Sequence, residues 1–382
     1  MSGVPQGTFG TVDHYIHRQR RAAVKTFVSK KTVQTVQPSI CSTVELLCRE
    51  FDRFAASGET FECGTFFLAW ATDSVAKYLE NDTYGLLENA HRRREWQETI
   101  SQVVELTPLV KQFPFFMPFV LKVPGWLMGV LSPKMNRVLL MHKRMRSTAR
   151  RYLNFHTAAE KRTDGSVETP SHPSDGKVDA YRAILSSTLP AIDKQPDRVA
   201  QEVLTLLVGG SATTMRVMLR VVYHVNSTPG VLGRLTKTLD AAASPELEVL
   251  EKQEYLVAVV KESLRIATAL TARLPLVSPS KPLVYTNNEG TEWVVPAGTP
   301  TSMSISRIHM DPTIYANPYS FWPDRCFAWA ELLICTAILF RRFAFELVDV
   351  DRARDIDVQR DCFLGQPSRE SRGLRVKVRT RG

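Results

Sequence analysis

The chain has 382 residues, of which 44% are hydrophobic and 23% charged. This composition supplies a sizeable core and excludes a protein that spans a membrane many times. The net charge is +10, and basic runs lie near positions 17–21, 91–94 and 143–151. Because these runs fall on expected amphipathic helices and no nucleic-acid motif is present, we interpret them as solvated faces or a docking surface for an acidic protein, not as a nucleic-acid site.

The cysteines indicate a reducing compartment. Six occur, at positions 41, 48, 63, 326, 335 and 362, without a Cys-x-x-Cys pair. We therefore expect reduced thiols and no zinc site. No secretory leader and no apolar run of about twenty residues is evident, so we expect a protein that is not secreted and does not span a membrane.

The apolar periodicity predicts helices through most of the chain. The expected helices, in order, cover residues 12–27, 38–56, 66–79, 95–112, 134–155, 197–225 and 245–266. Two segments break this pattern. Residues 113–133 are apolar but carry four prolines, so we expect a buried loop or a segment that dips into a membrane interface. Residues 160–178 have the composition of a polar loop.

The last third of the sequence mixes strands and helices. Short strands are expected at 282–285 and 291–295, followed by a Gly/Pro turn at 296–298. A last helix is expected over 327–343 and a closing strand over 343–350. Because no repeat or linker divides the chain, the sequence predicts one domain, residues 1–382, that is mainly α with small β-sheets.

The longest expected helix contains the run Gly209-Gly210-Ser-Ala-Thr213-Thr214. Each glycine inside a helix costs about 1 kcal/mol relative to alanine, so something should need the space they leave. Two explanations stay open from the residues alone. The glycines make room for a flat cofactor and a small bound molecule, or they allow another helix to pack closely.

A second pattern lies downstream. Glu262 and Arg265 are three residues apart, so on a helix they share a face and can pair. Residues 309–325 are dense in proline and aromatic residues and end in Arg325, which could join the pair. A buried network of this kind is tolerated only when every member is paired, so it should lock two segments together. We expect His309 to be a buried hydrogen-bonding residue and not a metal ligand.

The order Glu-x-x-Arg, His-x-Asp-Pro, Phe-x-Pro-Asp-Arg resembles the C-terminal half of a cytochrome P450, a haem-thiolate monooxygenase. The closing stretch, residues 327–378, is similar to fungal members that act on secondary metabolites. The resemblance implies the P450 fold and a haem cofactor. It also implies electrons from NADPH through a reductase partner and an apolar substrate of the terpenoid or polyketide type. The implied location is the cytoplasm or the periphery of the endoplasmic reticulum membrane.

The resemblance also implies roles for individual residues. Thr213 and Thr214 would serve catalysis, with Thr213 assisting proton delivery, while Gly209 and Gly210 would lie against the haem. The family's usual acid before the threonine is replaced here by Ala212. The propionate partners would be His17, Arg21 and Arg273, since charge-assisted bonds to carboxylates are strong. Glu262, Arg265 and Arg325 would form the structural triad.

The iron ligand is where the chain departs from the family. The Phe-x-x-Gly-x-Arg-x-Cys-x-Gly loop that carries the axial cysteine does not occur, and Arg325 is followed directly by Cys326. Cys326 is therefore the candidate thiolate. The N-terminal anchor, the proline hinge and the first sheet of the family are also expected to be missing. The alternative prediction is an inactive or mis-spliced relative that acts at most as a helical ligand- or partner-binding protein.

Overall fold

The computed structural model describes residues 6–25, 36–113, 115–161, 179–323 and 330–381. The expectation of a mainly helical protein with small sheets is confirmed. The helices are α1 His14–Lys25, α3 Gln37–Ser57, α4 Cys63–Glu80, α5 Ala90–Gln112, α6 Phe116–Lys122, α7 Gly125–Leu131, α8 Pro133–Lys161, α9 Ala180–Leu185, α10 Pro196–Ser227, α11 Val231–Ala241, α12 Leu247–Leu250, α13 Glu254–Ala267, α14 Ile305–His309 and α15 Ala330–Arg342. The strands are β1 Phe61–Glu62, β2 Leu276–Val277, β3 Leu283–Thr286, β4 Glu292–Val295, β5 Pro300–Thr301, β6 Phe343–Leu347, β7 Arg360–Cys362, β8 Leu364–Gln366 and β9 Arg375–Thr380.

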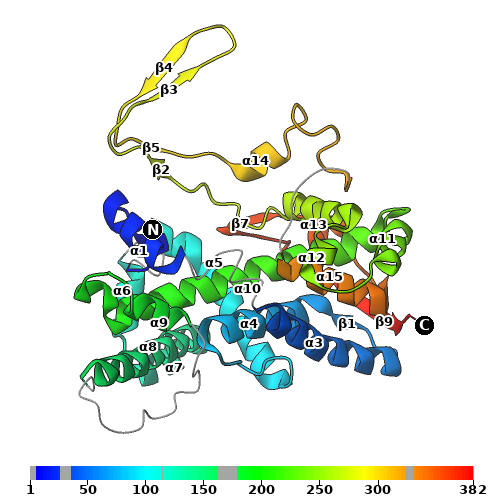
Figure 1. Cartoon of the computed structure of the whole chain (residues 1–382), viewed down its shortest axis with the longest axis horizontal. Coiled ribbons are helices and arrows are strands. Elements are labelled where there is room, and N and C mark those ends of the chain that lie inside the picture. Colours follow the sequence, from blue (N-terminus) through cyan, green and yellow to red (C-terminus); the bar gives the residue numbers. More distant parts are fainter. Residues whose placement is uncertain (1–5, 26–35, 114, 162–178, 324–329, 382) are drawn as a thin grey trace.

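Helix α10 runs through the middle of the molecule, with α3 and α4 on one side of it and α13 on another (Figure 1). Pro196 occupies its first turn, where a missing N–H costs nothing, and Asp197 places a negative charge at the positive end of the helix dipole. Val203, Leu207 and Val221 are fully buried. These residues share one face of the helix, which is therefore held by packing along that face.

The core continues into the sheet β1–β9–β6, which is antiparallel throughout. Phe51 of α3 is fully buried and contacts the rings of Phe61, Phe343 and Phe345 at centroid separations of 5.1, 5.8 and 6.0 Å. Tilted and edge-on contacts at these separations are favourable beyond the area they bury. The C-terminal strands are in this way fastened to the N-terminal helices.

A second part of the chain stands away from this body as an arm, residues 276–309, containing β2–β5 and the hairpin β3–β4 (Figure 1). The hairpin pairs Leu283 with Val295 and turns through Gly290, whose φ of 82° suits a residue without a side chain. Tyr285 and Trp293 are exposed. Both strand positions expected from the sequence are thus present, but little packs on them.

Several boundaries differ from expectation. The helix expected over 245–266 is two helices, α12 and α13, separated by a turn. Helix α5 starts five residues earlier than expected because the Asn89 side chain caps it by accepting the N–H of Arg92. Within the segment 113–133, α6 and α7 form over residues 116–122 and 125–131 in place of a buried loop, and Phe119 and Trp126 are exposed. Most of the expected polar loop, residues 162–178, lies outside the described residues.

One helix bears on the expectation of no spanning segment. Among the described helices, α10 is long and apolar enough to cross a membrane by length and composition. Half of its apolar window is buried in the protein, which is equally expected of a core helix. The feature is therefore weak evidence for a membrane span.

Candidate active site

An apolar cavity of about 320 Å³ lies along α10. Its walls come from α5, α8, α10 and the loops that carry Leu270 and Phe363. Among the described residues that line it, His142 is the sole titratable side chain, and burial lowers its pKa, which keeps it neutral. The cavity suits an uncharged, greasy molecule or the apolar part of a larger one.

The two glycines of α10 serve different purposes. A Cβ on Gly210 would lie 3.0 Å from Cγ2 of Val75 on α4, so this glycine permits close helix packing. A Cβ on Gly209 would meet nothing within 4 Å, and Gly209 lines the apolar cavity. Of the two explanations left open by the sequence, helix packing accounts for Gly210 and space beside the cavity accounts for Gly209.

Thr213 also lines the apolar cavity, one turn after Gly209. Its hydroxyl donates a hydrogen bond to the carbonyl of Gly209 at 2.6 Å. The proton expected to assist catalysis is therefore held by the helix backbone and would be released by rotation of the side chain. Thr214 is half-buried and does not belong to the described lining.

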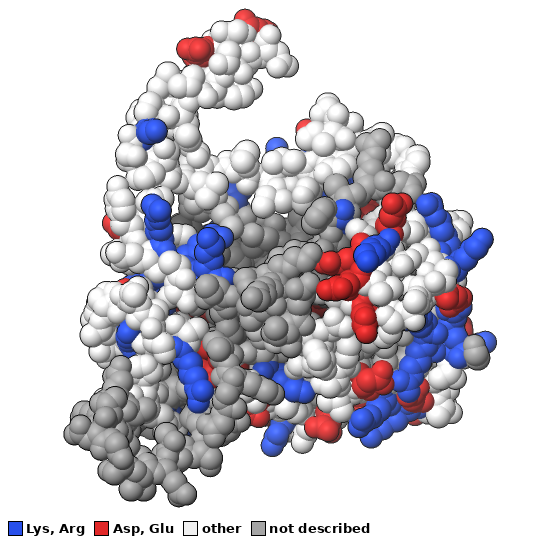
Figure 2. Space-filling model, viewed as in Figure 1, with Lys and Arg blue, Asp and Glu red and all other residues white. Residues whose placement is uncertain are grey.

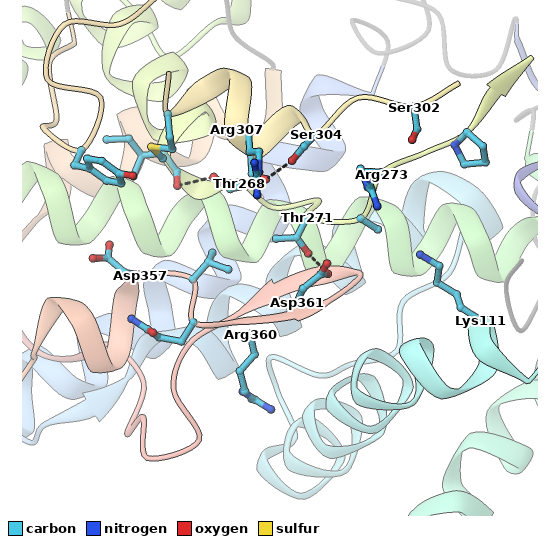
Figure 3. Close-up of a pocket in the computed structure, with 18 of the residues that line it drawn as sticks. Lys111, Thr268, Thr271, Arg273, Ser302, Ser304, Arg307, Asp357, Arg360 and Asp361 are labelled. Carbon is cyan, nitrogen blue, oxygen red and sulfur yellow. Dashed lines mark hydrogen bonds between the residues drawn. The ribbon is translucent and has the colours of Figure 1, made fainter. Parts of the chain in front are cut away.

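A second, larger cavity of about 1310 Å³ adjoins the first, because Val110 and Leu270 line one while Lys111 and Thr271 line the other. Figure 3 shows Arg273 and Lys111 among its walls, with Arg307 and Arg360 further along. Thr271 donates to Oδ1 of Asp361 at 2.5 Å. Arg273 is exposed and forms no hydrogen bond or ion pair with a described residue, so its charge is available to an anion.

His17 and Arg21 lie on α1, with His17 half-buried and Arg21 exposed, and neither is among the described residues that line these two cavities. The structure does not bring them together with Arg273 at one cavity. Their neighbour Arg20 is a structural residue. It contacts Asp193 Oδ1 at 2.5 Å and Thr11 Oγ1 at 2.8 Å.

Glu262 and Arg265 form the expected pair and are 4% and 8% exposed. Arg265 donates from Nε to Oε2 of Glu262 at 2.8 Å and from a terminal nitrogen to Oε1 at 2.6 Å. The same guanidinium donates to the carbonyls of His309 and Pro318 at 2.8 and 2.7 Å. Glu262 accepts the backbone N–H of Trp322 at 2.9 Å. The pair therefore clamps the segment 309–322 to α13.

Arg325, the third expected member of the clamp, lies outside the described residues. His309 is half-buried, and it is its backbone carbonyl that is bonded, while Nδ1 of its ring is buried without a partner in the described chain. The expectation that the His309 side chain forms hydrogen bonds is therefore wrong for Nδ1.

The described cysteines do not supply an iron ligand. Burial raises the pKa of the thiols of Cys48, Cys63 and Cys335, which keeps them protonated. None of the five described cysteines lines either cavity, and Cys326 lies outside the described residues. The described residues thus supply apolar and cationic walls that suit a haem, and the expected thiolate, Cys326, is not among them. No described residue of α15 lines either cavity.

A row of three buried basic side chains along α10 was not expected from the sequence. Arg216, Arg220 and His224 follow Ala212 at four-residue spacing, and all three are buried. His224 stacks on Phe321 at a centroid separation of 4.7 Å. The signal was present in the sequence, since charged residues at a helical period inside an apolar helix share one face.

The fold and the cavities along its central helix define a cytochrome P450-like protein, and comparison with known proteins gives the same result. The cytochrome P450 family model matches residues 5–327, and the chain belongs to this family. A solved cytochrome P450 structure, CYP102L1, superposes with a TM-score of 0.69 over 100% of this chain and 87% of that chain at 14% identity, which shows the fold.

Curated relatives are fungal enzymes. Tryptophan 6-hydroxylase fscE of Fusarium equiseti is 33% identical over 411 residues, covering 99% of this chain and 77% of that protein. N-acetyltryptophan 6-hydroxylase ivoC of Emericella nidulans is 29% identical over 418 residues, covering 100% of this chain and 78% of that protein. Both alignments are longer than the 382 residues of this chain, so the relatives contain internal positions without a counterpart here. The chain is thus a member of a monooxygenase family.

Proposed function

We propose that this chain is a haem-dependent monooxygenase that oxidises an apolar secondary metabolite in a fungal biosynthetic pathway. The observation that carries the proposal is the apolar cavity on the Gly209–Thr213 face of α10, whose described lining holds no charged side chain. A terpenoid or polyketide substrate agrees with that lining. We take residues 1–382 as a single domain of this enzyme.

Bound haem would supply the oxygen-activating and electron-accepting chemistry. The chain's own residues would hold the group and the substrate. Arg273 would bond a propionate from the larger cavity, and His17 and Arg21 are the further expected partners. Gly209 would leave space beside the ring, and Thr213, together with Thr214, would place a hydroxyl near the reacting atoms. Cys326 would provide the thiolate.

The relatives named as tryptophan and N-acetyltryptophan hydroxylases suggest a second substrate class, an indole. A planar aromatic ring suits the apolar cavity as well as a terpenoid does, because both need a greasy surface without charges. Binding of each class can be compared directly in one panel of ligands that contains both.

The proposed electron source is an NADPH-dependent reductase, and the proposed location is the cytoplasm or the periphery of the endoplasmic reticulum membrane. Exposed aromatic side chains on and beside α6 and α7, including Phe115, Phe119 and Trp126, support a membrane contact. On the face shown in Figure 2, basic and acidic side chains lie intermixed, which suits protein docking better than nucleic acid. Arg18 is exposed on α1 and is the better candidate for a docking residue, since Arg20 is held by Asp193.

The test is the difference spectrum of the reduced protein with carbon monoxide after haem loading. The proposal expects a thiolate-type spectrum that is lost in Cys326→Ser and kept in Cys41→Ser, a half-buried cysteine away from both cavities. A wild-type protein without this spectrum would contradict the proposal. That result would support the alternative, an inactive relative that binds ligands or partners.

A further inference from the structure

A third cavity, of about 150 Å³, continues from the apolar cavity along the same face of α10. Val104 and Leu364 line both of them. The third cavity differs in chemistry because Arg216 and Arg220 form part of its wall. A purely apolar ligand chamber would gain nothing from two guanidinium groups at its end.

Arg216 has no partner within the described chain. The residue is 6% exposed, its Nε is fully buried without a hydrogen bond, and no ion pair or hydrogen bond joins it to a described residue. Arg220 differs, since it donates to the carbonyl of Ile356. A buried charge without a partner is costly, so its presence calls for a function or a bound anion.

The acidic side chains that line the third cavity form no ion pair with Arg216. Glu62 is the N-terminal cap of α4 and accepts the N–H groups of Gly64 and Thr65 at 2.7 and 2.8 Å. Asp355 is bonded to Arg354 at 2.8 Å and accepts the N–H of Arg372 at 2.9 Å. Both carboxylates in the wall are therefore engaged elsewhere.

The charges around Arg216 also favour a bound anion. Burial, the nearby cation Arg220 and, more weakly, Arg360 lower the pKa of Arg216 to about 9, while Cys362 acts in the opposite direction. No carboxylate is among the groups that act on it. An anion placed in the cavity would be stabilised by two desolvated guanidinium groups.

We propose that the Arg216 cavity binds the carboxylate of a substrate whose apolar body occupies the cavity beside Thr213. Thr213 and Arg216 are three residues apart on one helix, a rise of about 4.5 Å, so a chain of a few atoms can link the two ends. A guanidinium can bind a carboxylate through two parallel bonds, which would fix the orientation of the substrate. This inference rests on the proposed function, since it assigns the acidic end of the same substrate.

The experiment measures equilibrium binding to the full chain by isothermal titration calorimetry with a matched pair of probes. Indole-3-propionate carries a carboxylate, and indole-3-propionamide has the same ring and chain length without the charge. We expect the acid to bind about tenfold to a hundredfold more tightly, the range of one charge-assisted hydrogen bond. In Arg216→Gln most of this preference should be lost, with only Arg220 left in the wall, while Arg94→Gln, a change of an exposed arginine on α5, should keep it.

The variant Arg216→Lys is a control for the case that Arg216→Gln does not fold. It retains the charge without the paired donors, so it should bind the acid with intermediate affinity while circular dichroism shows an unchanged helix content. Equal binding of acid and amide by the wild type, an unchanged preference in Arg216→Gln, or no binding of either probe would overturn the proposal. So would equally tight binding of acetate alone, because a small-anion site does not need the apolar body. These results are independent of the carbon monoxide spectrum, so each proposal can fail alone.

Discussion

Two buried arginines on neighbouring helices have opposite surroundings. Arg265 on α13 is bonded to Glu262 and to the backbone of the segment 309–320, while Arg216 on α10 has no partner in the described chain. Their exposed fractions are nearly equal, at 8% and 6%. Burial alone therefore does not distinguish a structural arginine from a ligand-binding one. The hydrogen-bond acceptors around each guanidinium group make that distinction.

The first prediction tests the paired arginine and has the largest expected effect. Arg265→Ala leaves Glu262 buried without its cation, so the free energy of unfolding should fall by about 3–5 kcal/mol. Urea denaturation followed by circular dichroism measures it. Arg49→Ala, an exposed arginine on α3, should change stability by less than about 0.5 kcal/mol. Similar losses in the two variants would mean that the clamp contributes little.

The second prediction concerns His224, which lies near both arginine sites. Burial and the cations Arg352, Arg220 and Arg265 lower its pKa to about 3. The unfolded chain takes up a proton near pH 6.5 while the folded chain does not, so stability is complete above pH 6.5 and is lost as pH falls toward 3. Between pH 6.5 and 5 the loss should be about 2 kcal/mol.

Denaturation at several pH values with His224→Phe isolates this effect. The phenylalanine keeps a ring against Phe321 and cannot titrate, so the variant should lose that part of the acid sensitivity. The exposed variant His91→Asn should retain the wild-type slope. Parallel pH profiles for His224→Phe and the wild type would show that His224 does not carry the effect.

The third prediction tests the unpaired arginine and expects the opposite sign. Arg216→Met removes a buried charge with no described partner and keeps most of the side-chain volume, so the ligand-free protein should become more stable by about 1–2 kcal/mol. Thermal unfolding without ligand measures it. If stability falls instead, Arg216 has a structural partner and the contrast with Arg265 disappears.

The fourth prediction sharpens the comparison at the surface. Arg20 and Arg18 lie two residues apart on α1, but Arg20 bonds Asp193 and Thr11 while Arg18 is exposed. Arg20→Ala should cost about 1 kcal/mol, and Arg18→Ala should leave the stability of the chain unchanged. Conversely, Arg18→Glu should slow salt-dependent electron transfer from the reductase. A rate that is unchanged at low salt would contradict docking through Arg18.

Local pattern was enough for much of the fold. Apolar periodicity located α3, α4, α10 and the start of α8 to within a few residues, because a helix that buries one face must repeat its apolar residues with the helical period. It did not find α6 and α7, since their prolines fall at positions where a short helix can begin or end. The spacing of Glu262 and Arg265 predicted their pairing for the same local reason.

The sequence by itself determined the family, the mainly helical class and the Glu262–Arg265 pair, because each depends on motifs or on neighbours along one helix. The tertiary structure alone decided which glycine of α10 packs and which borders a cavity, since that depends on Val75 of another helix. It alone showed that Arg20 and Arg265 are bonded to other residues, while Arg18 is exposed and Arg216 has no partner in the described chain. Such distinctions depend on acceptors that distant segments bring to a buried donor, and no local pattern encodes those distances.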